Sequence, residues 1–224
     1  MFANVPDNDC ITEAIYATLK ANGMSDGAHI RLTLTRGEKI TSGMDPRLNQ
    51  SGCTLIVLAE CKAPVYQNAV TLITSSIRRN GPANIDSKIH HNNLINNILA
   101  KIEANNAGAD DALMLDNNGF VAETNACNIF MIKNGMLFTP NADACLPGIT
   151  RKTVITLCQQ NNIPIHLKNI SLAEMYNADQ VFTTGTMGEL TAVKMIDGRA
   201  IINRSGTDLL QHINDLFRNL TLAL

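Results

Sequence analysis

Four groups of residues in this 224-residue chain are of types that do chemistry, and the first is a lysine in a very polar segment. The segment NIDSKIHHNNLINN, residues 84–97, holds Lys88, two histidines and the start of an apolar helical pattern. A lysine acts as a nucleophile when its amine is neutral, which requires burial or cationic neighbours. Asp86 is the nearest carboxylate. Taken alone, the pattern is more typical of an ordinary surface lysine.

Two turns have the residues needed to bind an anion. Pro147-Gly148 opens a predicted helix and leaves the amides of Ile149 and Thr150 at the positive end of the helix dipole. In TTGTMGEL, residues 183–190, two glycines among threonines follow a predicted strand, and such a turn can offer amides and a hydroxyl to an anion. Ordinary helix starts and ordinary turns use the same residues, so neither turn is specific by itself.

The fourth group is a carboxylate within an apolar strand pattern. Glu123 lies in FVAETNACNIF, at the end of a predicted strand and between apolar segments. If the side chain points inward, it needs a cationic partner, because an unpaired buried charge is costly. The alternative is a strand residue that points outward into water.

Taken together, these four groups are the parts that a pyridoxal phosphate site requires. A lysine forms the Schiff base, anion-binding turns hold the phosphate, and a carboxylate keeps the pyridine nitrogen protonated. The protonated ring then withdraws electrons from the Cα atom of the substrate. The sequence therefore predicts a pyridoxal phosphate enzyme in which Lys88 is the covalent anchor.

Apolar periodicity predicts the elements that must position these groups. The predicted helices cover residues 7–22, 92–106, 147–162, 171–178 and 206–221. The predicted strands cover residues 29–37, 52–60, 69–76, 111–116, 120–124, 128–133, 136–140, 164–171 and 179–186, and a hairpin covers 189–201. Of the first two strands, the one at 52–60 is expected to be more buried.

The order of these elements predicts an α+β fold in two parts. Residues 62–69 are interpreted as a linker, because they contain a proline and a change of character. Residues 1–65 then form a smaller α/β domain, and residues 66–224 form a larger domain rich in hairpins. Asn134-Gly135, between two apolar alternations, is a strong hairpin signal.

The composition excludes several classes of protein. Hydrophobic residues make up 45% of the chain and the formal net charge is −2, which indicates a folded core and argues against nucleic acid or an anionic membrane as partner. No apolar run approaches the roughly 18–20 residues of a membrane span and no secretory signal is visible, so a cytoplasmic protein is expected. The cysteines and histidines have no metal-binding spacing, so neither a metal nor a disulfide framework is expected.

From Lys88 to Asp197 the chain resembles the class IV, fold-type IV pyridoxal phosphate enzymes, which include branched-chain aminotransferases, D-amino-acid aminotransferases and aminodeoxychorismate lyases. The resemblance is carried by SKIHHNNLINNILAKIEA, ALMLDNNGFVAETNACNIF, LFTP, LPGITRKTVI and VFTTGTMGELTAVKMIDG, in the family's order and spacing. It implies a D-amino-acid aminotransferase-like fold, with a small α/β domain and a larger domain built on a barrel-like sheet with helices. HIRLTLTRG extends a weaker resemblance toward the N-terminus.

The resemblance also implies roles for residues around the cofactor. Lys88 would be the Schiff-base and proton-transfer lysine, and Glu123 would pair with the pyridine nitrogen. Leu146 would pack on the cofactor ring. The phosphate would be bound by the amides of Ile149 and Thr150 together with Thr186.

A second set of residues is implied for the substrates, which are expected to be two small molecules, an amino acid and a 2-oxo acid. The backbone of Thr186 and Met187 would receive the substrate carboxylate. Arg31 aligns with a family position that can recognise the acidic side chain of glutamate or 2-oxoglutarate, and Arg36 is a second candidate. The motifs are most similar to the branched-chain branch, so a branched-chain L-amino acid and 2-oxoglutarate are expected. The family is built as homodimers, so a homodimer is expected here.

Two departures from the family pattern leave other functions open. Asn93 stands five residues after Lys88, where branched-chain enzymes commonly have a tyrosine. Family members also carry further residues before the helix at 7–22, including an arginine that binds the phosphate, so the chain is interpreted as an N-terminally shortened form with a small domain that is incomplete. The alternatives are a D-amino-acid aminotransferase, an aminodeoxychorismate lyase and, from another class, a non-catalytic truncated homologue.

Overall fold

The structure is a computed structural model that describes residues 4–63 and 68–223. It divides into two compact units, residues 1–64 and residues 65–224. The segment interpreted as a linker, 62–69, lies partly outside the described residues. The assignment of two domains of the family type to this chain stays a prediction.

The first unit consists of a helix and a two-stranded antiparallel ribbon. Helix α1 (Asn8–Ala21) begins at Asp7, whose carboxylate accepts a hydrogen bond of 2.8 Å from a first-turn amide and so caps the helix. Strand β1 (Ala28–Thr35) pairs along its whole length with β2 (Thr54–Cys61). A short 3₁₀ helix, η1 (Pro46–Leu48), lies in the connection between the two strands.

None of the described residues of the first unit is fully buried. Ile56 and Leu58 of β2 are 40% and 57% exposed, and Leu32 on the other face of the ribbon is 46% exposed. The expectation that residues 52–60 form the more buried strand is therefore wrong. The strand itself forms, but two strands and one helix do not provide enough layers to cover both faces of a sheet.

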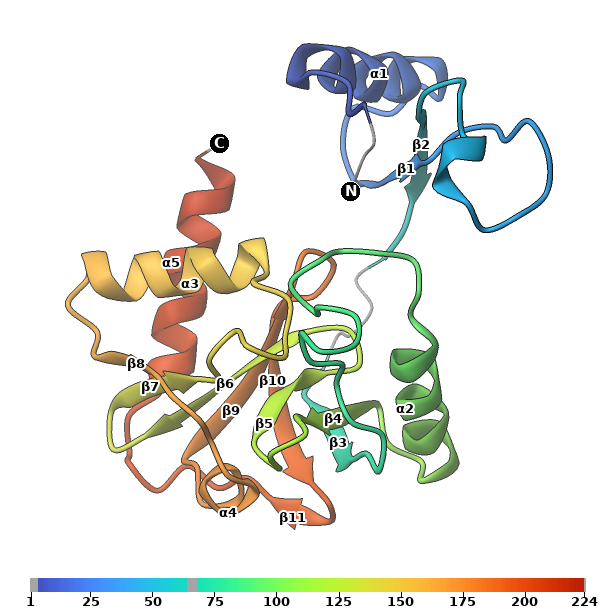
Figure 1. Cartoon of the computed structure of the whole chain (residues 1–224). Coiled ribbons are helices and arrows are strands. Elements are labelled where there is room, and N and C mark those ends of the chain that lie inside the picture. The colour runs from blue at the N-terminus through green and yellow to red at the C-terminus, as the bar shows by residue number, and fades with distance from the viewer. Residues whose placement is uncertain (1–3, 64–67, 224) are drawn as a thin grey trace. The chain divides into compact units, whose positions relative to one another are not determined.

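The second unit is built on a mixed sheet that curls into a half-barrel, shown in Figure 1. The described residues form nine strands of this sheet, which are β3 (Val70–Thr74), β4 (Asp111–Leu115), β5 (Val121–Thr124), β6 (Asn128–Lys133), β7 (Met136–Thr139), β8 (Ile165–Leu167), β9 (Gln180–Gly185), β10 (Glu189–Ile196) and β11 (Arg199–Ala200). Their order is β5-β4-β3-β10-β9-β6-β7-β8, with β11 on β10.

A short turn fixes the register of one hairpin in this sheet. Asn134-Gly135 joins β6 to β7 with φ values of 53° and 73°. Positive φ at both residues gives a turn whose twist matches the right-handed twist of the strands, and the predicted hairpin is confirmed. The parallel pairs β10–β3, β3–β4 and β7–β8 join segments that are distant in the sequence, so no local pattern predicts them.

Helices cover both faces of the sheet, so that its central strands are buried on both sides. Among the described residues the helices of this unit are α2 (Ile95–Asn106), α3 (Ile149–Gln160), α4 (Leu172–Tyr176) and α5 (Leu209–Leu222). Along β6, Ile129 and Met131 pack in the core that includes α4, whereas Phe130 and Ile132 pack in the core beneath α3 and α5. In Figure 1, α3 and α5 cross each other on one side of the sheet, and α2 lies beside β3 and β4.

Helix α2 packs on the sheet through its small residues. Ala100 and Ala104 are fully buried against Ala112 and Met114 of β4. The large apolar residues that define the helical pattern do not face this core. We call them the α2 stripe, and each is between 40% and 64% exposed: Leu94, Ile95, Ile98, Leu99 and Ile102. The pattern therefore predicts the helix correctly but not the face that meets the sheet.

The overall class of the fold is as predicted from the sequence. Helices and strands alternate around a curled sheet, so the α+β assignment is confirmed. Within the described parts of the chain, the structure has no helix that is both long and apolar enough to span a bilayer.

Candidate active site

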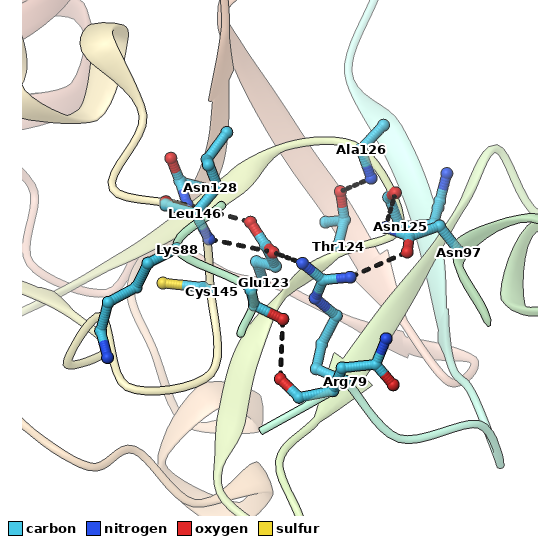
Figure 2. A network of polar contacts seen from close by, with 12 residues as sticks. Arg79, Lys88, Asn97, Glu123, Thr124, Asn125, Ala126, Asn128, Cys145 and Leu146 are labelled. Carbon is cyan, nitrogen blue, oxygen red and sulfur yellow. Dashed lines mark hydrogen bonds and ion pairs between the residues drawn. The ribbon is translucent and has the colours of Figure 1, made fainter. Parts of the chain in front are cut away.

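Glu123 lies on β5 opposite Met114 of β4, and its carboxylate points into the protein. The residue is 5% exposed. Arg79 Nη2 lies 2.6 Å from its Oε1 atom. The Leu146 amide donates to the same oxygen over 3.3 Å, and the Asn128 side chain donates to Oε2 over 3.1 Å. Figure 2 shows how these groups converge on the carboxylate. Three donors therefore hold Glu123 in one place.

Arg79 is the cationic partner that an inward Glu123 needs, and the sequence prediction does not include it. Arg79 follows β3 in the segment TSSIRRN and is 7% exposed. Its backbone amide donates to the Leu115 carbonyl over 2.9 Å, and its Nη1 atom donates to Asn97 Oδ1 over 2.8 Å. A usable signal is present in the sequence, because two adjacent arginines follow a strand of the same predicted domain.

The surroundings of Glu123 change its acid strength. Burial raises the pKa of the Glu123 carboxyl from 4.5 to about 7. The positive charge of Arg79 and the hydrogen bond from the Leu146 amide oppose this rise in pKa. The carboxyl is consequently a group whose protonation changes near neutral pH.

Asn128, the first residue of β6, joins Glu123 to the start of α3. Its Nδ2 atom donates to a carbonyl just before the helix over 2.7 Å, and its Oδ1 atom accepts from the Gly148 amide over 3.2 Å. Gly148 is the N-cap of α3, and no side chain within the described residues caps this helix. The amides of Ile149 and Thr150 therefore begin α3 without a side-chain acceptor, at the positive end of the helix dipole.

A cavity of about 250 Å³ opens at the start of α3. The structure brings the two predicted anion-binding turns together there, because Ile149 and Thr150 line this cavity together with Gly185 and Thr186. Side chains of α5 line the cavity as well, as does Glu189, which forms an ion pair of 3.6 Å with α5. Helix-start amides and threonine hydroxyls are groups that suit a phosphate.

A second cavity, of about 200 Å³, lies over Glu123. Arg79 and Leu146 line this cavity together with Glu123. Residues on both sides of Lys88 in the sequence also line it: Ser87, Ile89, His90 and His91. Leu146, predicted to pack on a cofactor ring, is thus in the same cavity as the predicted partner of the ring nitrogen.

Lys88 lies beside this network with its amine directed elsewhere. The side chain is 44% exposed, and Nζ lies 3.8 Å from Asp86 Oδ1. The backbone amide of Lys88 donates to the same oxygen over 3.0 Å. In Figure 2 the side chain points away from Glu123. An exposed amine beside a carboxylate is an ordinary surface ion pair, so the covalent role of Lys88 stays a prediction.

The residues predicted to recognise the substrates are spread over both units. Met187 is half-buried in the turn between β9 and β10. Arg31 is exposed on β1, opposite Leu58. Arg36 donates to the carbonyl of Pro46 over 3.4 Å. Arg31 and Arg36 belong to the first unit, and their part in substrate recognition stays a prediction.

A curled mixed sheet that carries a buried carboxylate next to an exposed helix start is the fold-type IV aminotransferase architecture. The profile of the amino-transferase class IV family matches residues 1–196. This chain belongs to the amino-transferase class IV family.

Two relatives illustrate how the chain aligns with longer proteins. Branched-chain-amino-acid aminotransferase-like protein 2 of Arabidopsis thaliana is 57% identical over 222 residues, which are 98% of this chain and 40% of the relative. A putative branched-chain-amino-acid aminotransferase of Methanocaldococcus jannaschii is 35% identical over 209 residues, which are 93% of this chain and 72% of the relative. The chain thus spans less than half of the Arabidopsis protein.

Solved structures of branched-chain aminotransferases have the same fold. The enzyme of Thermoproteus uzoniensis, solved with norvaline, has a TM-score of 0.90 and 30% identity, and the match covers 99% of this chain and 74% of that chain. The T.th. enzyme, solved with pyridoxamine 5′-phosphate, has a TM-score of 0.86 and 31% identity, and the match covers 97% of this chain and 72% of that chain.

The hydrogen bonds of Glu123 leave room for the ring nitrogen of a pyridoxal cofactor. A carboxylate has about four acceptor positions. Glu123 uses three of them, for Arg79, for the Leu146 amide and for Asn128. One acceptor position is left for a further N–H, and the cavity over the carboxylate gives access to it. The residues at this site therefore fit the cofactor.

A substitution at Gly148 tests whether the start of α3 is held as described. A Cβ atom at Gly148 would lie 2.3 Å from Asn128 Oδ1, so either the helix start or Asn128 must move. We expect Gly148→Ala to lower the free energy of unfolding by about 1–3 kcal/mol, measured by urea denaturation. Gly81→Ala is the control, because its Cβ would be 3.6 Å from the nearest side-chain atom. Equal effects of the two substitutions would contradict this arrangement.

The raised pKa of Glu123 predicts how stability depends on pH. The pKa of the Glu123 carboxyl is about 7 in the folded protein and about 4.5 in the unfolded chain. Between pH 4.5 and pH 7, the folded state therefore binds the carboxyl proton more tightly than the unfolded state does. The contribution of Glu123 to stability is complete below pH 4.5 and is lost as the pH rises through 7. The loss is on the order of 3 kcal/mol.

Glu123→Gln removes this titration without changing the shape of the side chain. We expect the free energy of unfolding of the variant, minus that of the wild type, to increase steadily from pH 4.5 to 7. Thermal and urea denaturation across this range measure the difference. A difference that does not change with pH would show that Glu123 is not a buried group with a raised pKa.

Proposed function

We propose that this chain is a pyridoxal phosphate-dependent aminotransferase that moves an amino group between a branched-chain L-amino acid and 2-oxoglutarate. The observation that carries the proposal is the buried carboxylate of Glu123, which has one acceptor position free and faces a cavity. The branched-chain aminotransferase names of the relatives support the choice of substrates. A cytoplasmic location is part of the proposal.

The chain's own residues would bind and orient the cofactor. When bound, pyridoxal phosphate supplies an aldehyde that condenses with amines and a ring that withdraws electrons from the substrate Cα. Glu123 would hold the proton on the ring nitrogen, which makes the ring a stronger electron acceptor. Leu146 would pack against the ring. The phosphate would be bound at the start of α3 and in the β9–β10 turn, by Ile149, Thr150 and Thr186.

Lys88 would attach the cofactor and would move the proton at the substrate Cα. Both tasks require a neutral amine, so Nζ must leave Asp86 and enter a more buried environment. The neighbouring residues Ser87 and Ile89 line the cavity over Glu123, which supports the proposal that a reorientation of the lysine side chain would bring Nζ toward it.

The substrates would be recognised mainly through their carboxylates. The backbone of Thr186 and Met187 would receive the carboxylate common to amino and oxo acids. Arg31, with Arg36 as a second candidate, would distinguish 2-oxoglutarate by its acidic side chain, since a guanidinium binds a carboxylate in a bidentate manner.

Reduction with borohydride tests the role of Lys88 directly. We expect pyridoxal phosphate to bind the purified chain with a visible absorbance band, and borohydride to fix it on the peptide that contains Lys88, as identified by mass spectrometry. Lys88→Ala should lose this adduct, and amino transfer should fall about 10²–10⁴-fold through the loss of proton transfer alone. Lys194→Ala, at an exposed position on β10, is the control and should keep both.

Other outcomes of the same experiments select the alternatives. Amino transfer from D-alanine but not from L-leucine would select a D-amino-acid aminotransferase. Pyruvate release from aminodeoxychorismate, without any need for a 2-oxo acid, would select a lyase. If wild type and Lys88→Ala behave identically, with no adduct and no transfer, the chain is a non-catalytic homologue and the proposed function is wrong.

We also propose that a second copy of the chain covers the α2 stripe. Five large apolar side chains on one exposed helix face form the kind of patch that marks an interface. A twofold axis can place one such stripe against its copy, because the interface is then self-complementary. Leu94 belongs to the stripe and also lines the cavity over Glu123, so the partner would border the candidate site.

The mass of the protein in solution tests this interface. We expect light scattering to give twice the mass of one chain for the wild type. Ile98→Asp should shift the equilibrium to monomer, because it places a charge in the stripe. Asn105→Asp adds the same charge at another exposed position of α2 and should remain dimeric. A monomeric wild type, or a dimeric Ile98→Asp variant, would contradict the proposal.

A further inference from the structure

Arg79 is a buried cation that the proposed chemistry does not use directly. It is 7% exposed and lies 2.6 Å from Glu123. Its Nη1 atom donates to Asn97 Oδ1 over 2.8 Å, and its Nε atom has no hydrogen-bond partner among the described residues. A buried guanidinium with a donor unused is costly, so its presence at this position needs an explanation.

The hydrogen bonds around Arg79 reach the loop that carries Lys88. The next residue, Asn80, accepts from Ser87 Oγ through its carbonyl over 2.7 Å. The Asn80 side chain also accepts from Asn96 Nδ2 of α2 over 2.7 Å. The loop between Arg79 and Lys88 is thus closed on itself by Ser87 and is tied to α2. Arg79 therefore lies next to a residue that holds both this loop and α2.

Several charged or titratable groups surround Glu123, but Arg79 is the cation in direct contact with it. Arg151 acts on the Glu123 carboxyl through its positive charge alone. The Arg151 guanidinium donates a hydrogen bond of 2.9 Å to the Pro140 carbonyl and not to Glu123. Other titratable groups near the carboxylate are thiols, imidazoles and the amine beside the network: Cys127, Cys145, His90, His91 and Lys88. Burial raises the pKa of both thiols to about 12, so they do not supply charge near neutral pH.

We infer that Arg79 is a positioning residue that favours the charged form of the Glu123 carboxyl, holds it in place for the ring nitrogen and ties it to α2. The inference rests on the proposed function. It follows from the geometry of one guanidinium, which contacts Glu123 through Nη2 and α2 through Nη1. Loss of the positive charge leaves a buried carboxylate that takes up a proton, and a protonated carboxyl cannot stabilise a protonated ring nitrogen.

The first test uses the protein without cofactor. In a chain labelled with ¹³C at glutamate carboxyls, the Glu123 signal is assigned with Glu123→Gln and followed as a function of pH. We expect Arg79→Gln to raise the midpoint of the Glu123 titration by about 1–3 pH units. Asn97→Ala is the matched control. It breaks the other guanidinium hydrogen bond but keeps the charge, so the midpoint should stay within about 0.5 unit of the wild type.

The second test measures the affinity for pyridoxal phosphate at pH 7 by absorbance. If only the charged form of Glu123 binds the ring, a shift of 1–3 units reduces the competent fraction and weakens binding about 5- to 500-fold. Arg79→Lys keeps the charge and should restore most of the affinity. A purely structural role would give equal losses for Arg79→Gln and Arg79→Lys and would leave the titration of Glu123 unchanged.

These outcomes separate failure of this inference from failure of the proposed function. A Glu123 midpoint in Arg79→Gln equal to that of the wild type overturns the inference, even if the wild type binds the cofactor at Lys88. Failure of the wild type to bind the cofactor overturns the function, while the titration still reports on the ion pair. If Arg79→Gln does not fold, Arg79→Lys decides: a folded variant whose Glu123 midpoint rises by more than about one unit overturns the inference.

Discussion

The ion pair between Arg79 and Glu123 is the interaction on which the rest of the site depends. Both side chains are less than a tenth exposed, and a buried charge is tolerated only when its partner and its hydrogen bonds are in place. Arg79 follows β3, Glu123 lies on β5, and β4 lies between these strands. The pair therefore exists only when the parallel β3–β4 ladder and the antiparallel β4–β5 ladder both form in their native register.

The same carboxylate sets the position of the anion-binding cavity. Asn128 contacts Glu123 with one end of its side-chain amide and the Gly148 amide with the other, so the start of α3 is fixed relative to the carboxylate. Because Gly148 has no Cβ, the helix start can approach Asn128 closely. One polar network thus connects the carboxylate with the start of α3. The amine of Lys88, by contrast, is exposed and lies outside this network.

Features encoded by local residues could be predicted from the sequence, and features that depend on distant packing could not. The Asn134-Gly135 turn and the helix at 92–106 follow from neighbouring residues alone. The outward orientation of the α2 stripe does not, because small alanines on the other face of the helix fit the sheet more closely. Glu123 and both anion-binding turns could be identified. The paired arginines after β3 are a signal for Arg79, but its contact with Glu123 could not be predicted, since that contact depends on the parallel pairing of β3 with β4.

A crystal structure of the chain soaked with pyridoxal phosphate tests the central claim most directly. We predict continuous density between the cofactor and Nζ of Lys88, with the ring nitrogen in hydrogen-bond contact with Glu123. The phosphate should lie at the amides that begin α3, and the ion pair between Arg79 and Glu123 should be retained. A cofactor bound to another lysine, or a ring nitrogen that does not contact Glu123, would contradict the account.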